Sequence, residues 1–387
     1  MKIIPELALN EKGSSPFRSS LRVAIVLPAL GAGGTEHVVN VLANQWVARG
    51  WSVTIVTLEA LEASTYYSFH PDVQIRRLGL PPERRSQLPA LVMSFKRIRL
   101  LRRTLREVAP DVIFSFLTRT NVMTLIAARR LDFSVVVSER NNPALQNVGP
   151  IWRTLRAKFY PSAFGLVTMT NGALQYFAPE MRRRSWVIPN PVDLPYTGER
   201  RRGGNILAAV GRLVPQKGFD LLLKAFAQVS PHCPEWTLVI WGEGPDRAAL
   251  EAERDRLGLR GRVEMPGVTS RPGIWVDTAD AFVLSSRFEG WGIALLEAMA
   301  ADLPVVSFDC EWGPREMIDD EHSGLLVEPE NVDALACALR RVLGDGDLRN
   351  RLAAAAGPSA RRFTPQHIME QWDEVAHAAL AARLAGS

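Results

Sequence analysis

The chain contains two separate stretches in which apolar, strand-like runs alternate with helical patterns. The first stretch is RVAIVLPAL, TEHVVNVLANQWVARG and WSVTIVTL, and the second is NILAAVGRL, FDLLLKAFAQVS and WTLVIWGEG. A strand, a helix and a second strand in this order form a βαβ unit, whose strands pair in parallel under a cover of helices. Because the pattern starts twice, we predict an α/β protein with two doubly wound, Rossmann-like domains that face each other across a cleft.

The domain boundaries follow from length and composition. A chain of 387 residues is long enough for two hydrophobic cores. The segment VIPNPVDLPYTGERRRGG, residues 187–204, is rich in proline, glycine and arginine, as interdomain linkers are. The C-terminal helical pattern follows the second domain and could cross back to the first. We therefore predict a polar lead-in over residues 1–20, a first domain over 21–195, a second domain over 196–362 and a C-terminal helix over 363–387.

Charge divides the chain at the same place. Residues 1–195 hold 25 lysine and arginine against 13 aspartate and glutamate residues, a net charge of +12. Residues 196–387 hold 21 against 28, a net charge of −7. The basic first half favours an anionic ligand or surface, although basic surface residues also serve solubility alone.

Cysteine and histidine patterns exclude some classes of protein. The three cysteines are scattered and form no CxxC motif or cluster with the six histidines. We therefore predict neither a disulfide framework nor a metal site, and a cytoplasmic location is the better interpretation. No uncharged apolar run reaches the roughly 18 residues of a membrane-spanning helix, and the N-terminus has no apolar core of signal-peptide length.

The loop GAGGTE, residues 31–36, follows the first predicted strand and opens the first helix. Gly33 and Gly34 would let the backbone approach a ligand, and the helix N-terminus offers free N–H groups to an anion. The alternative is an ordinary tight turn. A dinucleotide fingerprint requires a third glycine where this chain has Glu36, so the motif does not predict NAD binding.

The loop VGRLVPQKG follows the first strand of the second domain and carries Arg212 and Lys217. An arginine that forks onto oxygens and a lysine acting as a point charge form a plausible diphosphate clamp. The alternative is a solvent-exposed loop that binds no ligand, because arginine and lysine often occur together in such loops.

The segment EGWGIALLEAMA, residues 289–300, is predicted to change from loop to helix near Gly292 or Ile293. The amides from Trp291 onward would then face phosphate or sugar oxygens. Glu289 and Glu297 could each accept two hydrogen bonds from a vicinal diol, which sugars and riboses supply. Surface charge is one alternative. General acid–base catalysis of the glycosidase type is another alternative. In glycosidases, however, the two carboxylates face each other across the scissile bond, whereas here they flank a predicted helix N-terminus.

Two further loops follow predicted strands. SERNNP, residues 138–143, would place Glu139, Arg140 and Asn141 at the cleft, or form a simple turn closed by Pro143. FDCEWGPREMI, residues 308–318, has a Gly-Pro turn before a short helix, and ordinary turn chemistry explains it equally well.

The segment LVMSFKRIRLLRRTLREV, residues 91–108, holds six basic residues and one acidic residue. Its apolar residues recur at helical spacing and predict one packed stripe: Leu91, Phe95, Ile98, Leu101, Leu105 and Val108. A basic amphipathic helix suits an anionic bilayer surface. A solvated face on a core-packed helix is the alternative. No nucleic-acid-binding module is recognised, so nucleic acid is not a predicted partner.

Taken in order, these motifs resemble a known family. VGRLVPQKG, WGEGPDRAAL, RFEGWGIALLEAMAADLPVV and GLLVEP resemble the second domain of retaining GT-B glycosyltransferases of the group 1, or family 4, type. In the first domain, GAGGTEHVVNVLA, SFLTRTN and SERNNP resemble the bacterial members that build lipid-linked oligosaccharides and surface polysaccharides. The resemblance runs from about residue 21 to residue 375.

The resemblance implies roles for individual residues. Arg212 and Lys217 match the cations that hold the donor diphosphate, Glu289 the contact to the donor sugar and Glu297 the ribose ligand. Trp291, Gly292 and Ile293 match the loop whose amides meet sugar and phosphate, while Gly33 and Gly34 match the loop that closes from the first domain. The catalytic set is thus Arg212, Lys217 and Glu289. Arg119, Glu139, Arg140 and Asn141 are candidates for the acceptor side.

Two positions depart from the family pattern. Many members carry a histidine in a first-domain loop near the donor sugar, where SFLTRTN offers Arg119 instead. The family usually has a glycine at the position that Asp302 occupies, just before LPVV. The change at Asp302 affects only a turn.

The resemblance implies retaining sugar transfer from a UDP- or GDP-type nucleotide sugar, with no metal ion or other cofactor. The acceptor would be a growing glycan, polyprenyl-diphosphate-linked, at the inner face of the cytoplasmic membrane. Two alternatives stay open: a transferase with a soluble acceptor, and a nucleotide- or anion-binding protein without turnover.

Overall fold

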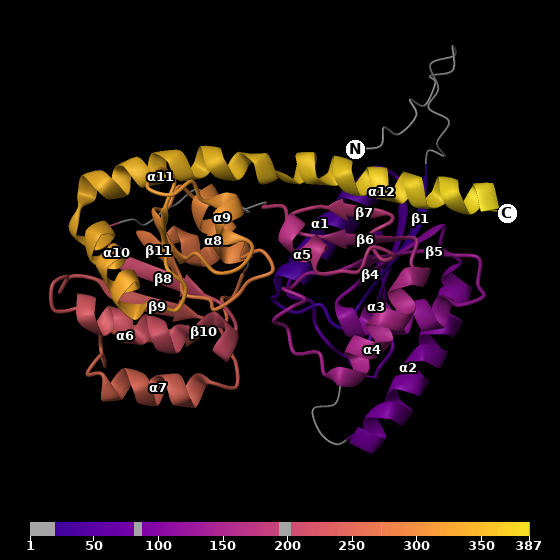
Figure 1. Ribbon diagram of the computed structural model, residues 1–387, viewed down its shortest axis with the longest axis horizontal. Coiled ribbons are helices and arrows are strands. Elements are labelled where there is room, and N and C mark those ends of the chain that lie inside the picture. The colour runs from indigo at the N-terminus through magenta and orange to yellow at the C-terminus, as the bar shows by residue number, and fades with distance from the viewer. Residues whose placement is uncertain (1–19, 81–86, 193–202, 272, 387) are drawn as a thin grey trace, which may run out of the picture.

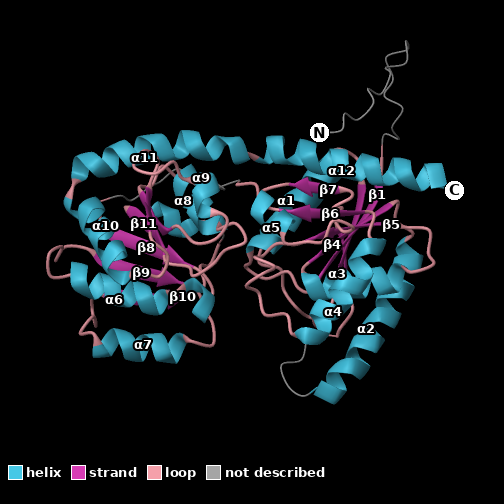
Figure 2. Cartoon of the chain, in the orientation of Figure 1, coloured by secondary structure: helices cyan, strands magenta, loops and turns pink. Residues whose placement is uncertain are grey.

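The computed structural model describes residues 20–80, 87–192, 203–271 and 273–386. Over these residues the chain forms two parallel β-sheets that lie side by side, each with helices on both faces (Figure 1, Figure 2). The predicted fold class of two Rossmann-like domains is confirmed. Except for Ser20, the predicted polar lead-in lies outside the described residues, as does most of the predicted linker.

The first sheet has seven strands among the described residues, in the order β3-β2-β1-β4-β5-β6-β7. All neighbouring strands pair in parallel. Strand order reverses between β1 and β4, and ligands bind beyond the carboxyl ends of the strands at such a point. The strands are β1 (Arg22–Leu27), β2 (Ser52–Thr57), β3 (Gln74–Arg77), β4 (Val112–Phe116), β5 (Ser134–Ser138), β6 (Gly165–Thr168) and β7 (Ser185–Val187).

Helices cover both faces of the first sheet, which explains why β1 is buried after its first residue. One face carries α1 (Gly34–Ala48) and α12 (Pro365–Gly386). The other carries α2 (Gln87–Val108), α3 (Thr118–Ala128) and α4 (Pro150–Phe159). The short α5 (Asn171–Gln175) follows β6.

The second sheet repeats this design with six strands among the described residues, in the order β10-β9-β8-β11-β12-β13. One face carries α6 (Phe219–Val229) and α10 (Val332–Gly344), and the other carries α8 (Ile293–Ala300) and α11 (Gly346–Ala360). Two shorter helices complete the domain: α7 (Arg247–Arg256), which contacts α6, and α9 (Pro314–Met317). The strands are β8 (Ile206–Val210), β9 (Thr237–Trp241), β10 (Val263–Gly267), β11 (Ala281–Leu284), β12 (Val305–Phe308) and β13 (Leu325–Val327).

The C-terminal helix α12 belongs to the core of the first domain although it follows the second. Figure 1 shows α11 and α12 one after the other along the same side of both domains. Trp372 of α12 is fully buried, with its ring centroid 5.6 Å from that of Phe114 on β4. The Val192 N–H donates to the Phe363 carbonyl at 2.9 Å, so the two chain segments that join the domains lie together.

The basic helix α2 differs from its predicted pattern at one position. Leu101 and Leu105 are buried and Ile98 is partly buried, as predicted, but the side chain of Phe95 is 67% exposed. The prediction that Phe95 packs in the stripe is wrong, because the first turns of α2 project beyond α3 (Figure 1). The side chain of Leu91 lies outside the described residues. None of the described helices is both long and apolar enough to cross a bilayer.

Candidate active site

A cavity of about 640 Å³ lies between the two domains. Its walls are the loops after β1, β2, β4, β5, β6 and β7 of the first domain and those after β8, β9, β10 and β11 of the second. These are carboxyl-end loops, where parallel sheets bind ligands. The structure brings together here Gly33, Gly34, Arg140, Asn141, Arg212, Lys217, Glu289, Trp291, Gly292, Ile293 and Glu297.

The loop after β8 carries the predicted cation pair. Arg212 lies two residues after the end of β8, and Lys217 ends a short 3₁₀ turn (Pro215–Lys217). The next residue, Gly218, has φ +61°, and a side chain there would overlap the Ser285 carbonyl. The Ser285 hydroxyl donates to the Lys217 carbonyl at 2.9 Å, which fixes this loop to the end of β11.

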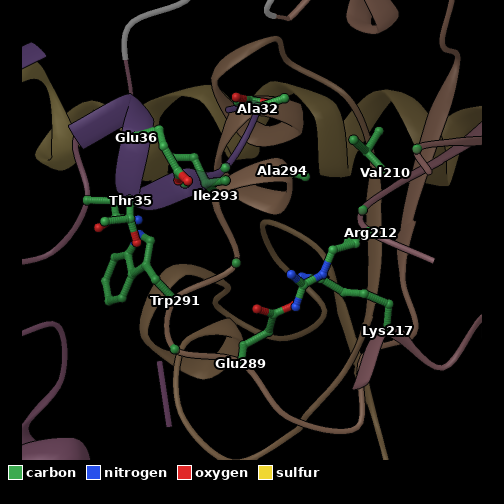
Figure 3. Close-up of a pocket in the computed structure, with 18 of the residues that line it drawn as sticks. Ala32, Thr35, Glu36, Val210, Arg212, Lys217, Glu289, Trp291, Ile293 and Ala294 are labelled. Carbon is green, nitrogen blue, oxygen red and sulfur yellow. The ribbon is translucent and has the colours of Figure 1, made fainter. Parts of the chain in front are cut away.

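Lys217 and Glu289 form an ion pair on the floor of the cavity. The Lys217 Nζ atom lies 2.6 Å from Glu289 Oε1, and the Ser286 hydroxyl donates to the same oxygen at 2.6 Å. Glu289 is 5% exposed and Ser286 is fully buried. The side chains of Arg212, Lys217 and Glu289 converge in Figure 3. Ser286 was not predicted; its position three residues before Glu289 was the only signal in the sequence.

Helix α8 begins where the sequence predicted, at Ile293, with Gly292 as its N-cap at φ +95°. The N-terminus of α8 lines the cavity through Gly292, Ile293 and Ala294. Glu297 lies one turn further along, and the Trp275 indole N–H donates to its Oε2 atom at 3.2 Å. Desolvation by the surrounding protein raises the pKa of Glu297 to about 7, and the Trp275 hydrogen bond opposes this rise. Trp275, from a 3₁₀ turn before β11, was not predicted.

The two glycines of the first-domain loop make room for named neighbours. A side chain at Gly33 would overlap the Glu36 carboxylate, which folds back over it. A Cβ atom at Gly34 would lie 3.2 Å from Cγ2 of Ile293, the first residue of α8 in the other domain. Gly34 therefore lets the first domain approach the N-terminus of α8.

The first domain meets the second at several points around the cavity. The Tyr66 hydroxyl lies 2.6 Å from the Thr269 hydroxyl, across the cleft. Gly290 lies against the backbone of Arg140 and Asn141, and Gly172 lies against the Trp312 ring. Tyr66 and Tyr67 line the cavity in a loop after β2 that no motif marked.

The predicted acceptor-side residues divide into two groups. Arg140 and Asn141 line the cavity. Arg140 donates to the Ile188 carbonyl at 3.2 Å and to Asn190, and burial lowers its pKa to about 9.

Glu139 and Arg119 do not line the cavity, contrary to prediction. Glu139 is buried inside the first domain, where it accepts hydrogen bonds from Thr118 and Tyr160. Arg119 donates to the Val148 carbonyl at 3.3 Å, with its guanidinium over the Trp152 ring. Both Glu139 and Arg140 follow the last residue of β5, Ser138, and their hydrogen-bond partners set their directions: Glu139 turns to Tyr160, whereas Arg140 bonds to the Ile188 carbonyl and lines the cavity.

No group of three or more histidine, cysteine, aspartate or glutamate side chains in the described part of the chain is arranged to hold a metal ion. The groups on the cavity wall whose chemistry suits a phosphate are Arg212, Lys217 and the N-terminus of α8.

Sequence comparisons match both domains to glycosyltransferase families. Residues 33–191 match the glycosyl transferase 4-like domain, and residues 198–357 match the glycosyl transferases group 1. Together with the two facing Rossmann-like domains, these matches define a GT-B glycosyltransferase. The chain belongs to the group 1, or family 4, glycosyltransferases, a retaining class.

Individual relatives lie at moderate distance. Over 358 residues the chain is 28% identical to the GalNAc-alpha-(1->4)-GalNAc-alpha-(1->3)-diNAcBac-PP-undecaprenol alpha-1,4-N-acetyl-D-galactosaminyltransferase of Campylobacter jejuni, covering 91% of this chain and 97% of the relative. It is 30% identical over 282 residues to an exopolysaccharide phosphotransferase of Streptomyces coelicolor, covering 71% of this chain but only 29% of that protein. The HepE protein of Anabaena, crystallised with UDP and glucose, superposes with a TM-score of 0.76 at 17% identity, covering 92% of this chain and 99% of HepE.

Proposed function

We propose that the protein moves a sugar, with retention, from a UDP-type nucleotide sugar to a growing polyprenyl-diphosphate-linked glycan in cell-surface polysaccharide or oligosaccharide synthesis. The observation that carries the proposal is the cluster of Arg212, Lys217 and Glu289 beside the N-terminus of α8. The UDP bound to HepE and the undecaprenol-linked substrate named for the Campylobacter relative support the choice of donor and acceptor.

In this proposal each part of the cavity takes one part of the donor. Arg212, Lys217 and the α8 amides hold the diphosphate, Glu289 holds the donor sugar and Glu297 accepts the ribose hydroxyls. Negative charge grows on the leaving diphosphate as the glycosidic bond to the donor breaks. Cations and a helix N-terminus that are already in place stabilise that charge, so the surrounding charges and dipoles need not reorganise during the reaction. Stabilisation of this kind supplies much of the rate enhancement of many enzymes.

The test is release of nucleoside diphosphate from a panel of UDP- and GDP-sugars, measured with and without polyprenyl diphosphate sugars. We expect release from one donor that depends on the lipid-linked acceptor. Release with a soluble acceptor alone would contradict the lipid-linked assignment. Binding of nucleotides without any release under all conditions would identify a non-catalytic binding protein.

We further propose that the first domain docks on an anionic bilayer through the surface formed by α2 and α4, both of which contact α3. Phe95 on α2 and Ile151 on α4 are exposed apolar side chains, at 67% and 55%. Exposed bases accompany them: Lys96, Arg99, Arg103, Arg106, Arg153 and Lys158. Exposed apolar side chains among bases fit the boundary between anionic headgroups and acyl chains.

Charge reversal on this surface tests the docking. We expect Lys96→Glu with Arg99→Glu to lower partitioning onto phosphatidylserine vesicles at least about 30-fold at low salt, because each basic residue lost near such a surface removes about 1 kcal/mol and each new carboxylate is repelled. The measurement is co-sedimentation with vesicles. Arg340→Glu with Arg351→Glu makes the same charge change on exposed positions of the second domain and should have little effect. Equal losses in both variants, or no retention of the unmodified protein, would rule the surface out.

A further inference from the structure

Glu36 presents a carboxylate to the cavity from the first domain. It lies in the first turn of α1 and lines the cavity. Its carboxylate folds over Gly33, where a side chain could not fit. Ile293 of α8 covers the neighbouring Gly34, and in Figure 3 the end of the Glu36 side chain lies beside Ile293. Glu36 is therefore held at the place where the first domain meets the N-terminus of α8.

The charged surroundings of Glu36 are mixed. Arg212 faces it from the second domain and Glu59 from the end of β2, where Arg77 pairs with Glu59 at 3.1 Å. Tyr66, Tyr67 and Glu297 also line the cavity, and Tyr67 lies within electrostatic range of both Glu36 and Glu297. Desolvation by burial raises the pKa of Glu36 to about 7, against lowering by its own backbone N–H and by Arg212. His37 is buried, which lowers its pKa to about 4, so it stays neutral above pH 6.

A diphosphate at Arg212 changes this balance. Its negative charges would pair with Arg212, the cation that otherwise favours the ionised form of Glu36. They would also repel the Glu36 carboxylate at short range in a partly desolvated cavity. A neutral carboxyl group avoids the repulsion and gains an O–H that can donate to a phosphate oxygen, as other carboxyl groups kept neutral by their sites do.

We propose that Glu36 is a proton-carrying ligand of the donor diphosphate: it takes up a proton as the nucleotide binds and donates a hydrogen bond to a phosphate oxygen. This inference rests on the proposed placement of the diphosphate at Arg212. It assigns the acidic residue of the GAGGTE loop a part in donor binding, and gives Gly33 the role of leaving room for it.

The sign of the pH dependence follows from linkage. A group whose pKa rises on binding favours the complex at low pH, and this contribution is lost as pH rises through the pKa of the bound form. For a free pKa of about 7 and a rise of one unit, UDP affinity should fall about fourfold between pH 7 and 8.5 from Glu36 alone. At pH 7.5 the same rise corresponds to uptake of roughly half a proton.

Isothermal titration with UDP, in buffers of different ionisation enthalpy at pH 7.5, measures this proton. We expect the unmodified protein to take up roughly half a proton more than Glu36→Gln, which is neutral and keeps a donor group. The protons of UDP and of Glu297 enter both titrations equally and cancel in the difference. Inorganic pyrophosphate, which has no ribose to engage Glu297, should give the same difference.

Alanine at Gly33 provides a second test that leaves Glu36 in the chain. Gly33→Ala should displace the carboxylate and abolish the extra proton uptake, whereas Gly31→Ala, in open space in the same loop, should not. If UDP binds and the unmodified protein and Glu36→Gln take up the same number of protons, the inference about Glu36 is wrong while the proposed function stands. Failure of the unmodified protein to bind UDP, GDP or pyrophosphate overturns the proposed function as well.

Discussion

Lys217→Ala is expected to lower kcat/KM for sugar transfer by roughly 10³-fold while the chain stays folded. Lys217 Nζ lies in the cavity, 2.6 Å from Glu289 Oε1, in a loop held by Ser285. A cation placed in advance stabilises the charge that grows on the leaving diphosphate, and alanine removes it. The loss should therefore appear in kcat more than in donor affinity.

The substitution also frees Glu289. With Lys217 gone, the Ser286 hydroxyl still donates to Oε1 but no cation holds it, so the carboxylate can turn away from the donor sugar. Steady-state rates with the preferred donor, together with a thermal melt, measure both effects. Lys224→Ala is the matched control: it makes the same change at an exposed position of α6 that does not line the cavity. Full activity of Lys217→Ala would remove Lys217 from the site.

Gly290→Ala is expected to lower kcat/KM by roughly 10²-fold through loss of domain closure. A Cβ atom at Gly290 would lie 2.7 Å from the Arg140 carbonyl oxygen and 2.7 Å from the Asn141 Cα atom. Both are backbone atoms of the first domain and cannot turn aside. Restoring van der Waals contact requires the domains to separate by on the order of 1 Å, a displacement large enough to disturb a reacting geometry.

The donor-binding residues of the second domain keep their places, and only the first-domain contact from Glu36 is moved away, so UDP affinity should fall far less than turnover. Titration with UDP and steady-state kinetics together separate the two quantities. Gly344→Ala is the control, because it adds the same methyl group to the second domain in open space. Unchanged turnover in Gly290→Ala would mean that the reaction does not use this contact between the domains.

Local patterns were sufficient to predict the elements that carry the site. Strand-like runs followed by glycine-containing loops located β1, β8 and the start of α8 at Ile293, because apolar periodicity and turn chemistry depend on neighbouring residues. The rule that parallel strands present ligand sites at their carboxyl ends then placed Arg212 and Glu289 at one cleft.

Side-chain direction could not be predicted in the same way. Glu139 and Arg140 are neighbours in one motif, yet Glu139 bonds to Tyr160 inside the first domain and Arg140 lines the cavity. Phe95 has helical spacing with Leu101 and Leu105 on α2, but it is exposed while they are buried. In both cases the outcome depends on which segment covers the residue, and that segment lies far away in the sequence.

The sequence by itself determined the two Rossmann-like domains, the loops that bear the chemistry and the residue types those loops present. The tertiary structure alone decided which of these residues meet. Lys217 reaches Glu289, Trp275 orients Glu297, and Tyr66 touches Thr269 across the cleft. The physical reason is the distance along the chain over which each effect acts. The periodicity of apolar residues and the turn preferences depend on a few neighbouring residues. An ion pair or hydrogen bond between distant segments depends instead on the register of two sheets and the closure of two domains.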